Sequence, residues 1–140
     1  MGRILAIDYG KKRVGLAVTD ELKLIATSLG TVSTADVMDY LQAYAQSNAL
    51  ECIVVGEPRD MANRPSRVEA DIQPFLNRLA KVLPLIPIER YDERFTSRIA
   101  SQAILDSGVN KKKRQNKALV DAVSATLILQ SYLEAHQKPR

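Results

Sequence analysis

The sequence predicts an α/β fold, a mixed five-stranded sheet with helices on both faces, and two observations support this. β-rich runs come first, at residues 3–8, 13–19 and about 25–33, and only a four-residue connection separates the first two. After them, apolar strand-like runs alternate with segments of helical periodicity. The three leading strands should therefore be antiparallel, and the later ones should join the sheet in parallel through βα crossovers.

The first two strands are expected to form a hairpin, because the connection between them contains Gly10, a residue able to take a positive φ. A helix should follow the third strand from Ala35 to about Ser47, with Ser33 or Thr34 as its N-cap. The apolar run after it predicts a buried strand over residues 51–56.

The second half of the chain continues the alternation. A polar segment beginning at Glu57 should be a loop that leads, from about Ser66, into a helix with Pro74 inside it. Two prolines frame a short strand over residues 86–91, and helices are expected within 92–108 and over about 114–135. Residues 136–140 should form a frayed tail.

Length and composition indicate one globular domain over residues 1–140. The chain is 46% hydrophobic and 26% charged, and no stretch approaches the roughly 20 apolar residues of a membrane span. Its first residues lack the features of a signal peptide, so a cytoplasmic location is expected. The single cysteine, Cys52, is interpreted as a buried strand residue, and it excludes both an intramolecular disulfide and a multi-cysteine zinc site.

Positive charge is concentrated in one segment. The net charge is +4, and residues 111–117, KKKRQNK, hold five of the 20 basic residues. Such a patch is typical of proteins that bind a phosphate backbone, although a single charged run can equally be a solvated loop.

Acidic residues follow the strands that are expected to be parallel. Asp8 ends the first strand, Glu57 follows the fourth, and Asp92 and Glu93 follow the fifth. Functional sites of parallel sheets form outside the carboxyl ends of the strands, so these acids should lie along one edge. Asp8 also ends an apolar run, where an unpaired carboxylate is costly.

The last helix adds a further acid to this edge. Asp121 shares its helical face with Lys117, Ala118, Ser124, Ala125 and Ile128, and the small residues among them allow close approach to the sheet. Each acid also has a plainer interpretation. Asp8 could begin a turn, Glu57 could be a loop acid, and Glu93 or Asp121 could pair with a neighbouring basic residue.

Converging carboxylates repel one another unless a cation relieves the repulsion. Mg²⁺ and Mn²⁺ prefer oxygen ligands, and pairs of these ions promote phosphoryl displacement. Zinc is disfavoured because the chain has one histidine, His136, and one cysteine. For the same reason a nucleophile activated by histidine is not expected.

Three segments, IDYGKKRVGLAVTD, YDERFTSRIA and NKALVDAVSATLIL, resemble the YqgF/RuvX family in order and spacing. Its members are ribonuclease H-like proteins described as Holliday junction resolvases or as nucleases that mature the 5′ end of pre-16S rRNA. The resemblance implies a ribonuclease H-like fold and a nuclease that uses Mg²⁺ or Mn²⁺ in a two-metal mechanism. It assigns Asp8, Glu93 and Asp121 as catalytic residues and metal ligands. Many members have Gly-Leu-Pro where this chain has Gly56-Glu57-Pro58, so Glu57 is either an extra ligand or a loop acid.

The same resemblance gives the basic residues of its motifs and of the charged segment a role in contacting phosphates. These nucleic-acid-binding residues are Lys11, Arg13, Arg94, Lys111, Lys112, Lys113, Arg114 and Lys117. Tyr9 could stack on a base or pack into the hairpin.

Pre-rRNA is the favoured substrate, and the protein should be a monomer or a weak homodimer. The alternatives are a Holliday junction resolvase acting on branched DNA and a nucleic-acid-binding protein that does not cleave. An actin-like ATPase is a further alternative, because its phosphate-binding loop is similar to the first motif. It is disfavoured, because such proteins need two domains to clamp a nucleotide and 140 residues supply only one.

Overall fold

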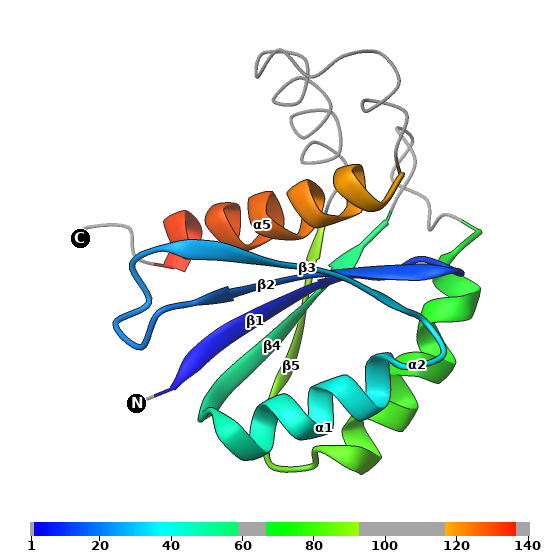
Figure 1. Ribbon diagram of the computed structural model, residues 1–140, viewed down its shortest axis with the longest axis horizontal. Helices are drawn as coiled ribbons and strands as arrows, with labels where there is room; N and C mark the ends of the chain where they lie inside the picture. The colour runs from blue at the N-terminus through cyan, green and yellow to red at the C-terminus, as the bar shows by residue number, and fades with distance from the viewer. Residues whose placement is uncertain (1, 59–66, 93–116, 137–140) are drawn as a thin grey trace.

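The computed structural model describes residues 2–58, 67–92 and 117–136 of the chain, the last without the side chains of residues 117–122. Figure 1 shows a twisted sheet with helices on both of its faces. The strands are β1 (Arg3–Asp8), β2 (Arg13–Thr19), β3 (Ala26–Ser33), β4 (Leu50–Glu57) and β5 (Ile88–Asp92). The described helices are α1 (Val37–Ser47), α2 (Glu69–Val82) and α5 (Lys117–His136).

The sheet has the strand directions expected from the sequence. Its strand order is β3-β2-β1-β4-β5, with β1 central. β1 pairs with β2, and β2 with β3, in antiparallel fashion, whereas β1 with β4 and β4 with β5 are parallel. The carboxyl ends of β1, β4 and β5 therefore lie at the same end of the sheet.

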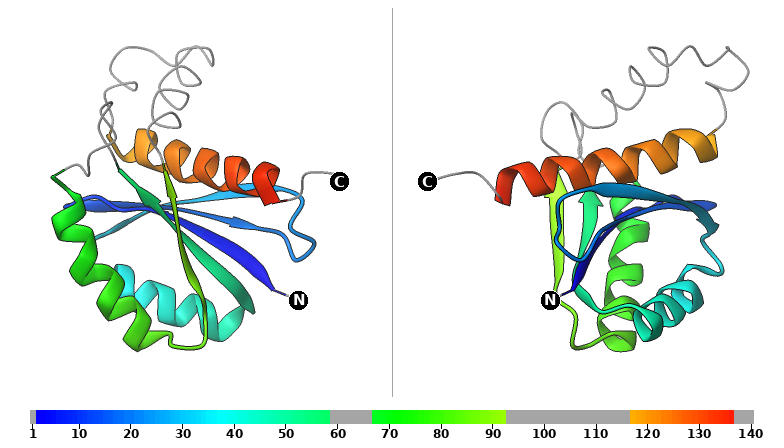
Figure 2. Two further views of the ribbon diagram at one scale, coloured as in Figure 1. Left: turned by 180° about the vertical axis from the view of Figure 1, so that it is seen from behind. Right: turned by 60° about the vertical axis from the view of Figure 1, so that its left-hand side comes forward.

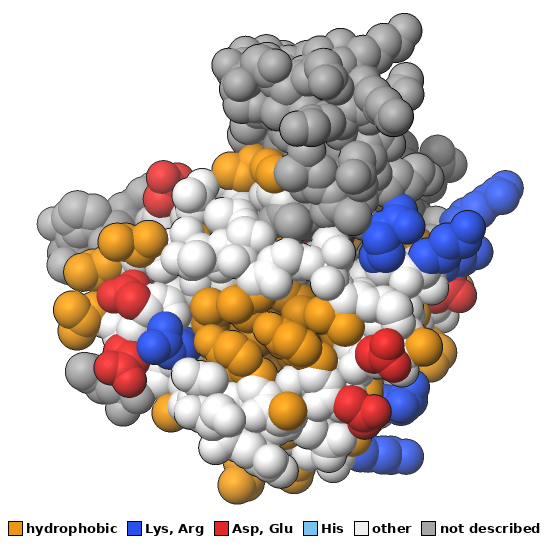
Figure 3. Space-filling model, viewed as in Figure 1, with side chains coloured by type: hydrophobic (Ala, Val, Ile, Leu, Met, Phe, Trp, Pro, Cys, Tyr) orange, Lys and Arg blue, Asp and Glu red, His pale blue; other side chains and the backbone are white. Residues whose placement is uncertain are grey.

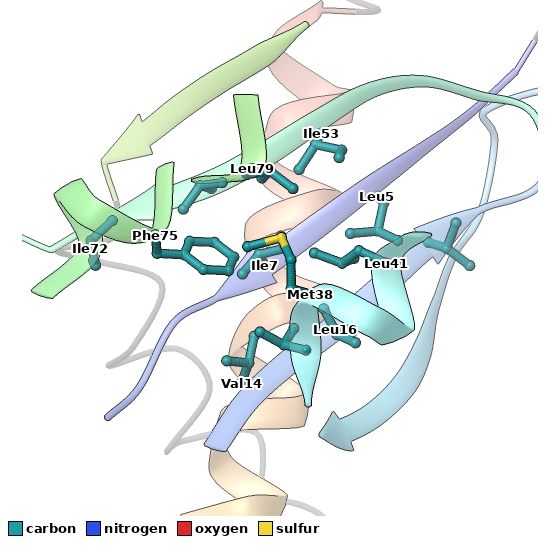
Figure 4. Close-up of a cluster of buried hydrophobic side chains, with 13 residues drawn as sticks. Leu5, Ile7, Val14, Leu16, Met38, Leu41, Ile53, Ile72, Phe75 and Leu79 are labelled. Carbon is teal, nitrogen blue, oxygen red and sulfur yellow. The ribbon is translucent and has the colours of Figure 1, made fainter. Parts of the chain in front are cut away.

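Helices α1 and α2 cover one face of the sheet, and Figure 4 shows the side chains packed beneath them. Leu5 and Ile7 of β1 and Ile53 of β4 lie in this core with Leu41 of α1 and Leu79 of α2. All five side chains have no solvent exposure. At roughly 1.5–3 kcal/mol for each fully buried aliphatic side chain, this face supplies a large share of the hydrophobic stabilisation.

Of the three described helices, only α5 covers the opposite face, where smaller residues allow it to approach closely. Ala6 of β1 and Val54 of β4 pack there with Ala125, Ile128 and Leu129 of α5. Residues adjacent in β1 or β4 thus belong to different cores, because successive side chains of a strand point to opposite faces. This alternation assigns a face to every position of the two strands.

The structure corrects the predicted helix cap and the role of Gly10. The N-cap of α1 is Asp36 without a side-chain cap bond, and Thr34 instead donates through Oγ1 to the carbonyl oxygen of Gly10, 2.7 Å away. Gly10 does not take a positive φ. Glycine is required there because a Cβ atom would lie 2.5 Å from the carbonyl oxygen of Arg13.

Other boundaries also differ from those expected, and α1 begins at Val37, two residues later than predicted. Glu57 is the last residue of β4 and does not begin a loop. β5 starts at Ile88, later than predicted, because the amide of Ile86 still closes a turn onto the carbonyl oxygen of Leu83. His136 is the last residue of α5 and is not part of a frayed tail: its ring stacks on Tyr132 with centroids 3.9 Å apart.

The helix predicted within residues 92–108 lies outside the described residues, except that Asp92 ends β5. Among the described residues, no helix is long and apolar enough to cross a membrane.

Candidate nuclease site

Asp8 is the last residue of β1, at the centre of the sheet, and it is half-buried. Its partner across the antiparallel ladder is Gly15 of β2. On the other side Ile7 pairs with Val55, so the next residue of β4 at the level of Asp8 is Gly56. Neither neighbouring strand therefore places a side chain beside Asp8. Glycine within a strand is typical of places where a ligand approaches the backbone.

The alternation along β1 places Asp8 on the face that α5 covers. Leu5 and Ile7 belong to the core under α1 and α2, and Tyr9 continues that series by packing on Phe75 of α2, with ring centroids 5.0 Å apart. Ala6 belongs to the core under α5, and Asp8 is two residues further along.

The first half of α5 runs over the same end of the sheet. Figures 1 and 2 show α5 beginning near the carboxyl end of β1 and ending towards the opposite end of the sheet. Near the end of the helix, Tyr132 donates through its hydroxyl to Glu89, in the first part of β5, over 2.8 Å. Position 121 precedes Ser124 and Ala125 by three and four residues, and both of these are buried against the sheet. Position 121 is thus on the stripe of α5 that faces the sheet.

Glu57 and Asp92 lie at the same end of the sheet but on its other face. They pair with each other in register at the ends of β4 and β5. Glu57 is two residues beyond Val55, which belongs to the core under α1 and α2. Asp92 is two residues beyond Arg90, whose guanidinium binds both carboxylate oxygens of Glu69 of α2 at 2.9 Å. The pleat therefore separates this pair from Asp8.

The connection after Asp8 is held against α2. The ammonium group of Lys11 lies 3.7 Å from a carboxylate oxygen of Asp71, and both side chains are exposed. Burial, followed by the nearby charge of Asp71, raises the pKa of Tyr9. Of the two interpretations of Tyr9, packing against the protein is the one that the structure shows, although the contact is with Phe75 of α2 and not within the hairpin.

Most of the remaining predicted site residues are not described at the level of side chains. Arg13 begins β2 and is half-buried. Lys117 and Asp121 lie in α5, but their side chains are outside the described part. Entirely outside the described residues are Glu93, Arg94, Lys111, Lys112, Lys113 and Arg114.

The donor chemistry at this end of the sheet fits a hard cation. Among the described side chains, no three acidic, histidine or cysteine residues form a group that could hold a metal ion. Cys52 is buried, and burial together with the charge of Glu89 raises its thiol pKa to about 11. His136 lies against Tyr132, at the other end of α5. Neither Cys52 nor His136 is thus placed to bind a metal ion together with Asp8. The carboxylate of Asp8 offers the oxygen ligands that Mg²⁺ and Mn²⁺ prefer.

Charge divides the molecule along the sheet. In the view of Figure 3, Lys and Arg side chains gather at the right-hand end, over the β1–β2 connection and α2. Acidic side chains lie at both ends, but the left-hand end, over the β2–β3 turn, shows few Lys and Arg side chains. Three large aliphatic residues of that turn, Leu22, Leu24 and Ile25, are each more than 60% exposed. The end that carries Asp8 is therefore the basic one.

Comparison with known proteins agrees with these observations. A family model described as "RuvX: Holliday junction resolvase" matches residues 2–135. The chain belongs to the RuvX family. It is 56% identical to a protein of Phocaeicola vulgatus over 96% of this chain and 97% of the relative, and 53% identical to one of Christiangramia forsetii over 95% and 98%. Both carry the name "Putative pre-16S rRNA nuclease".

Solved structures show that this RuvX family member has a ribonuclease H-like fold. The RuvC protein of T. thermophilus, in complex with a Holliday junction substrate, superposes with a TM-score of 0.60. It shares 16% sequence identity, and the match covers 99% of this chain and 97% of that chain. A second Thermus thermophilus RuvC structure gives a TM-score of 0.52 over 96% of both chains.

Proposed function

We propose that this protein is a metal-dependent endonuclease that hydrolyses phosphodiester bonds of precursor 16S rRNA at its 5′ end. The observation that carries the proposal is the position of Asp8. A carboxylate stands at the end of the central strand, on the face under α5, with glycine at the same level on both neighbouring strands. The choice of RNA follows the names of relatives that are 53% and 56% identical over nearly the whole chain.

In this proposal Asp8, Glu93 and Asp121 hold Mg²⁺ or Mn²⁺. Position 121 is supported by its place on the stripe of α5 that faces the sheet, and Glu93 by its place in the chain directly after β5. When bound, such ions activate a water molecule and stabilise charge on the phosphate oxygens. Asp8 anchors the site, because the sheet fixes its backbone and the residues at its level on β2 and β4 are glycines.

Basic residues of the protein would bind the backbone of the substrate. Lys11 and Arg13 flank the turn that follows Asp8, and Lys117 lies at the start of α5. Arg94 and the basic residues 111–114 would extend this surface. Contacts of this kind are to phosphates, so binding should weaken steeply with salt and depend little on sequence.

Cleavage of branched DNA is the second candidate, because the matching family model is described as a Holliday junction resolvase. The two substrates are separated by incubating wild type and Asp8→Asn with a labelled pre-16S rRNA fragment and with a four-way DNA junction, each with and without Mg²⁺ or Mn²⁺. We expect wild type to cleave the RNA only with metal, and Asp8→Asn to bind the RNA without cleaving it.

Other results would change the proposal. Cleavage of the junction alone would assign the second function. Equal cleavage by wild type and Asp8→Asn would indicate a contaminating nuclease and remove the assignment. Salt-sensitive binding without cleavage of either substrate would leave a binding protein.

A further inference from the structure

The connection between β1 and β2 is tied down by a residue that is distant in the sequence. Thr34, between β3 and α1, donates through Oγ1 to the carbonyl oxygen of Gly10 over 2.7 Å. Its backbone amide donates to the carbonyl oxygen of Lys12 over 3.0 Å. The first bond holds the peptide group between Gly10 and Lys11 and the second holds the one between Lys12 and Arg13, so one residue fixes the backbone before and after this exposed lysine.

The connection also has little freedom of its own. A Cβ atom at Gly10 would lie 2.5 Å from the carbonyl oxygen of Arg13, so the turn is closed tightly on itself. Tyr9 packs on Phe75 of α2 on the other side. The backbone from Asp8 to Arg13 is therefore held between the sheet, α2 and Thr34, while the side chain of Lys11 remains 73% exposed.

We propose that Thr34 is a positioning residue whose side-chain hydroxyl holds the Gly10–Lys12 turn so that Lys11 is presented to a backbone phosphate of the substrate. This inference rests on the proposed function, because it requires that Lys11 contacts nucleic acid. The present partner of Lys11 does not oppose the role. Asp71 is an exposed acid at 3.7 Å, and exposed ion pairs of this kind are weak enough for a phosphate to replace them.

The hydroxyl and not the bulk of Thr34 makes the contact, so Thr34→Val is the matched substitution. It keeps a β-branched side chain of similar shape and removes the donor to Gly10. Thr34→Ser retains a donor. The threonine at position 27, on the exposed edge strand β3, provides the control Thr27→Val, because the same change is made away from the turn.

The experiment is a double-mutant cycle on RNA binding. Binding of a labelled pre-16S rRNA fragment is measured by fluorescence anisotropy in EDTA, so that the RNA stays intact. The proteins are wild type, Thr34→Val, Lys11→Ala, their double variant, Thr34→Ser and Thr27→Val. We expect Thr34→Val to raise the Kd by about threefold to tenfold, which is the order of one hydrogen bond. Thr34→Ser and Thr27→Val should bind within about twofold of wild type.

The cycle separates positioning from a general structural effect. In the Lys11→Ala background, Thr34→Val should cause no further loss, since the contact that it supports is already gone. Thermal unfolding shows whether each variant is folded, and Thr34→Ala replaces Thr34→Val if the valine variant is not. An unchanged Kd for the variant without the hydroxyl, or an equal loss with and without Lys11, overturns the inference.

The same data distinguish this inference from the proposed function. If wild type binds and Lys11→Ala weakens binding while Thr34→Val does not, only the role of Thr34 is lost. If Lys11→Ala binds as wild type does, Thr34 has no phosphate contact to support and the inference is wrong, although cleavage that depends on Asp8 can still stand. If wild type does not bind the RNA, both fail.

Discussion

The two faces of the sheet differ in the chemistry that they present at the end where β1, β4 and β5 finish. On the face under α5, Asp8 has glycine at its level on both neighbouring strands. On the other face, Glu57 and Asp92 end paired strands above α2, and nearby Arg90 binds Glu69. One face thus offers a carboxylate flanked by glycines, and the other uses a charge pair to attach a helix. Position at a strand end does not by itself make an acid part of a site, because the pleat decides which acids can meet.

The largest expected effect compares the acids of the two faces in the cleavage assay. Asp8→Asn should lower the rate on the RNA by more than about 100-fold, since loss of even a supporting residue around a metal commonly costs 10–100-fold. Glu57→Gln and Asp92→Asn should stay within about threefold of wild type. A loss for either of these comparable to that of Asp8→Asn would mean that the faces are not functionally separate.

The next effect concerns stability and compares two side chains of β5. Arg90 binds both carboxylate oxygens of Glu69 and the carbonyl oxygens of Val55 and Gly56. Arg90→Met leaves Glu69, a side chain only 15% exposed, without this partner, and should lower the free energy of unfolding by about 2–4 kcal/mol. Glu89→Gln, on the α5 face, keeps an acceptor for Tyr132 and should cost less than about 1 kcal/mol. Urea denaturation measures both, and equal losses would contradict this difference between the faces.

The sequence predicted the arrangement of the strands better than it predicted where individual helices and strands begin and end. The number and direction of the strands were predicted correctly, because leading β-rich runs with short links and later alternation leave few topologies. The cap at Ser33 or Thr34 was wrong because the Thr34 hydroxyl binds Gly10, a partner 24 residues away that no local pattern reveals. Glu57 was expected in a loop because charged residues favour loops, yet pairing with β5 extends the strand to include it.

Sequence reasoning singled out Asp8 as a candidate site residue but not its surroundings in the sheet. Asp8 was identified because a charge ended a buried run. Its face was not predicted, since that follows from the packing of Ala6 against α5 and of Tyr9 against Phe75. Gly15 and Gly56 carried a usable signal, because glycine inside a strand pattern is unusual, but only the register shows that both flank Asp8. The catalytic roles of Asp8, Glu93 and Asp121 all stay predictions.

The smallest expected effect concerns the reactivity of Cys52, which tests how well α5 protects the face of the sheet beneath it from solvent. Burial raises the pKa of the Cys52 thiol to about 11 from 9.0, so at pH 8 the folded protein holds less of the reactive thiolate than the unfolded chain does. Alkylation by iodoacetamide should therefore be at least about tenfold slower in the native protein than in urea. Because the folded state keeps this proton to higher pH, the contribution to stability is present below pH 9 and is lost as the pH rises towards 11. Native alkylation as fast as in urea would show that α5 opens readily.

The separation of the two faces is tested most directly by calorimetric titration of Mn²⁺ into wild type, Asp8→Asn and the double variant Glu57→Gln/Asp92→Asn. Asp8→Asn removes one charge and the double variant removes two, so general electrostatic attraction alone would weaken the double variant more. We predict the reverse order: Asp8→Asn weakens Mn²⁺ binding at least about tenfold, and the double variant binds within about twofold of wild type. Binding that survives in Asp8→Asn and is lost in the double variant would contradict a metal site under α5.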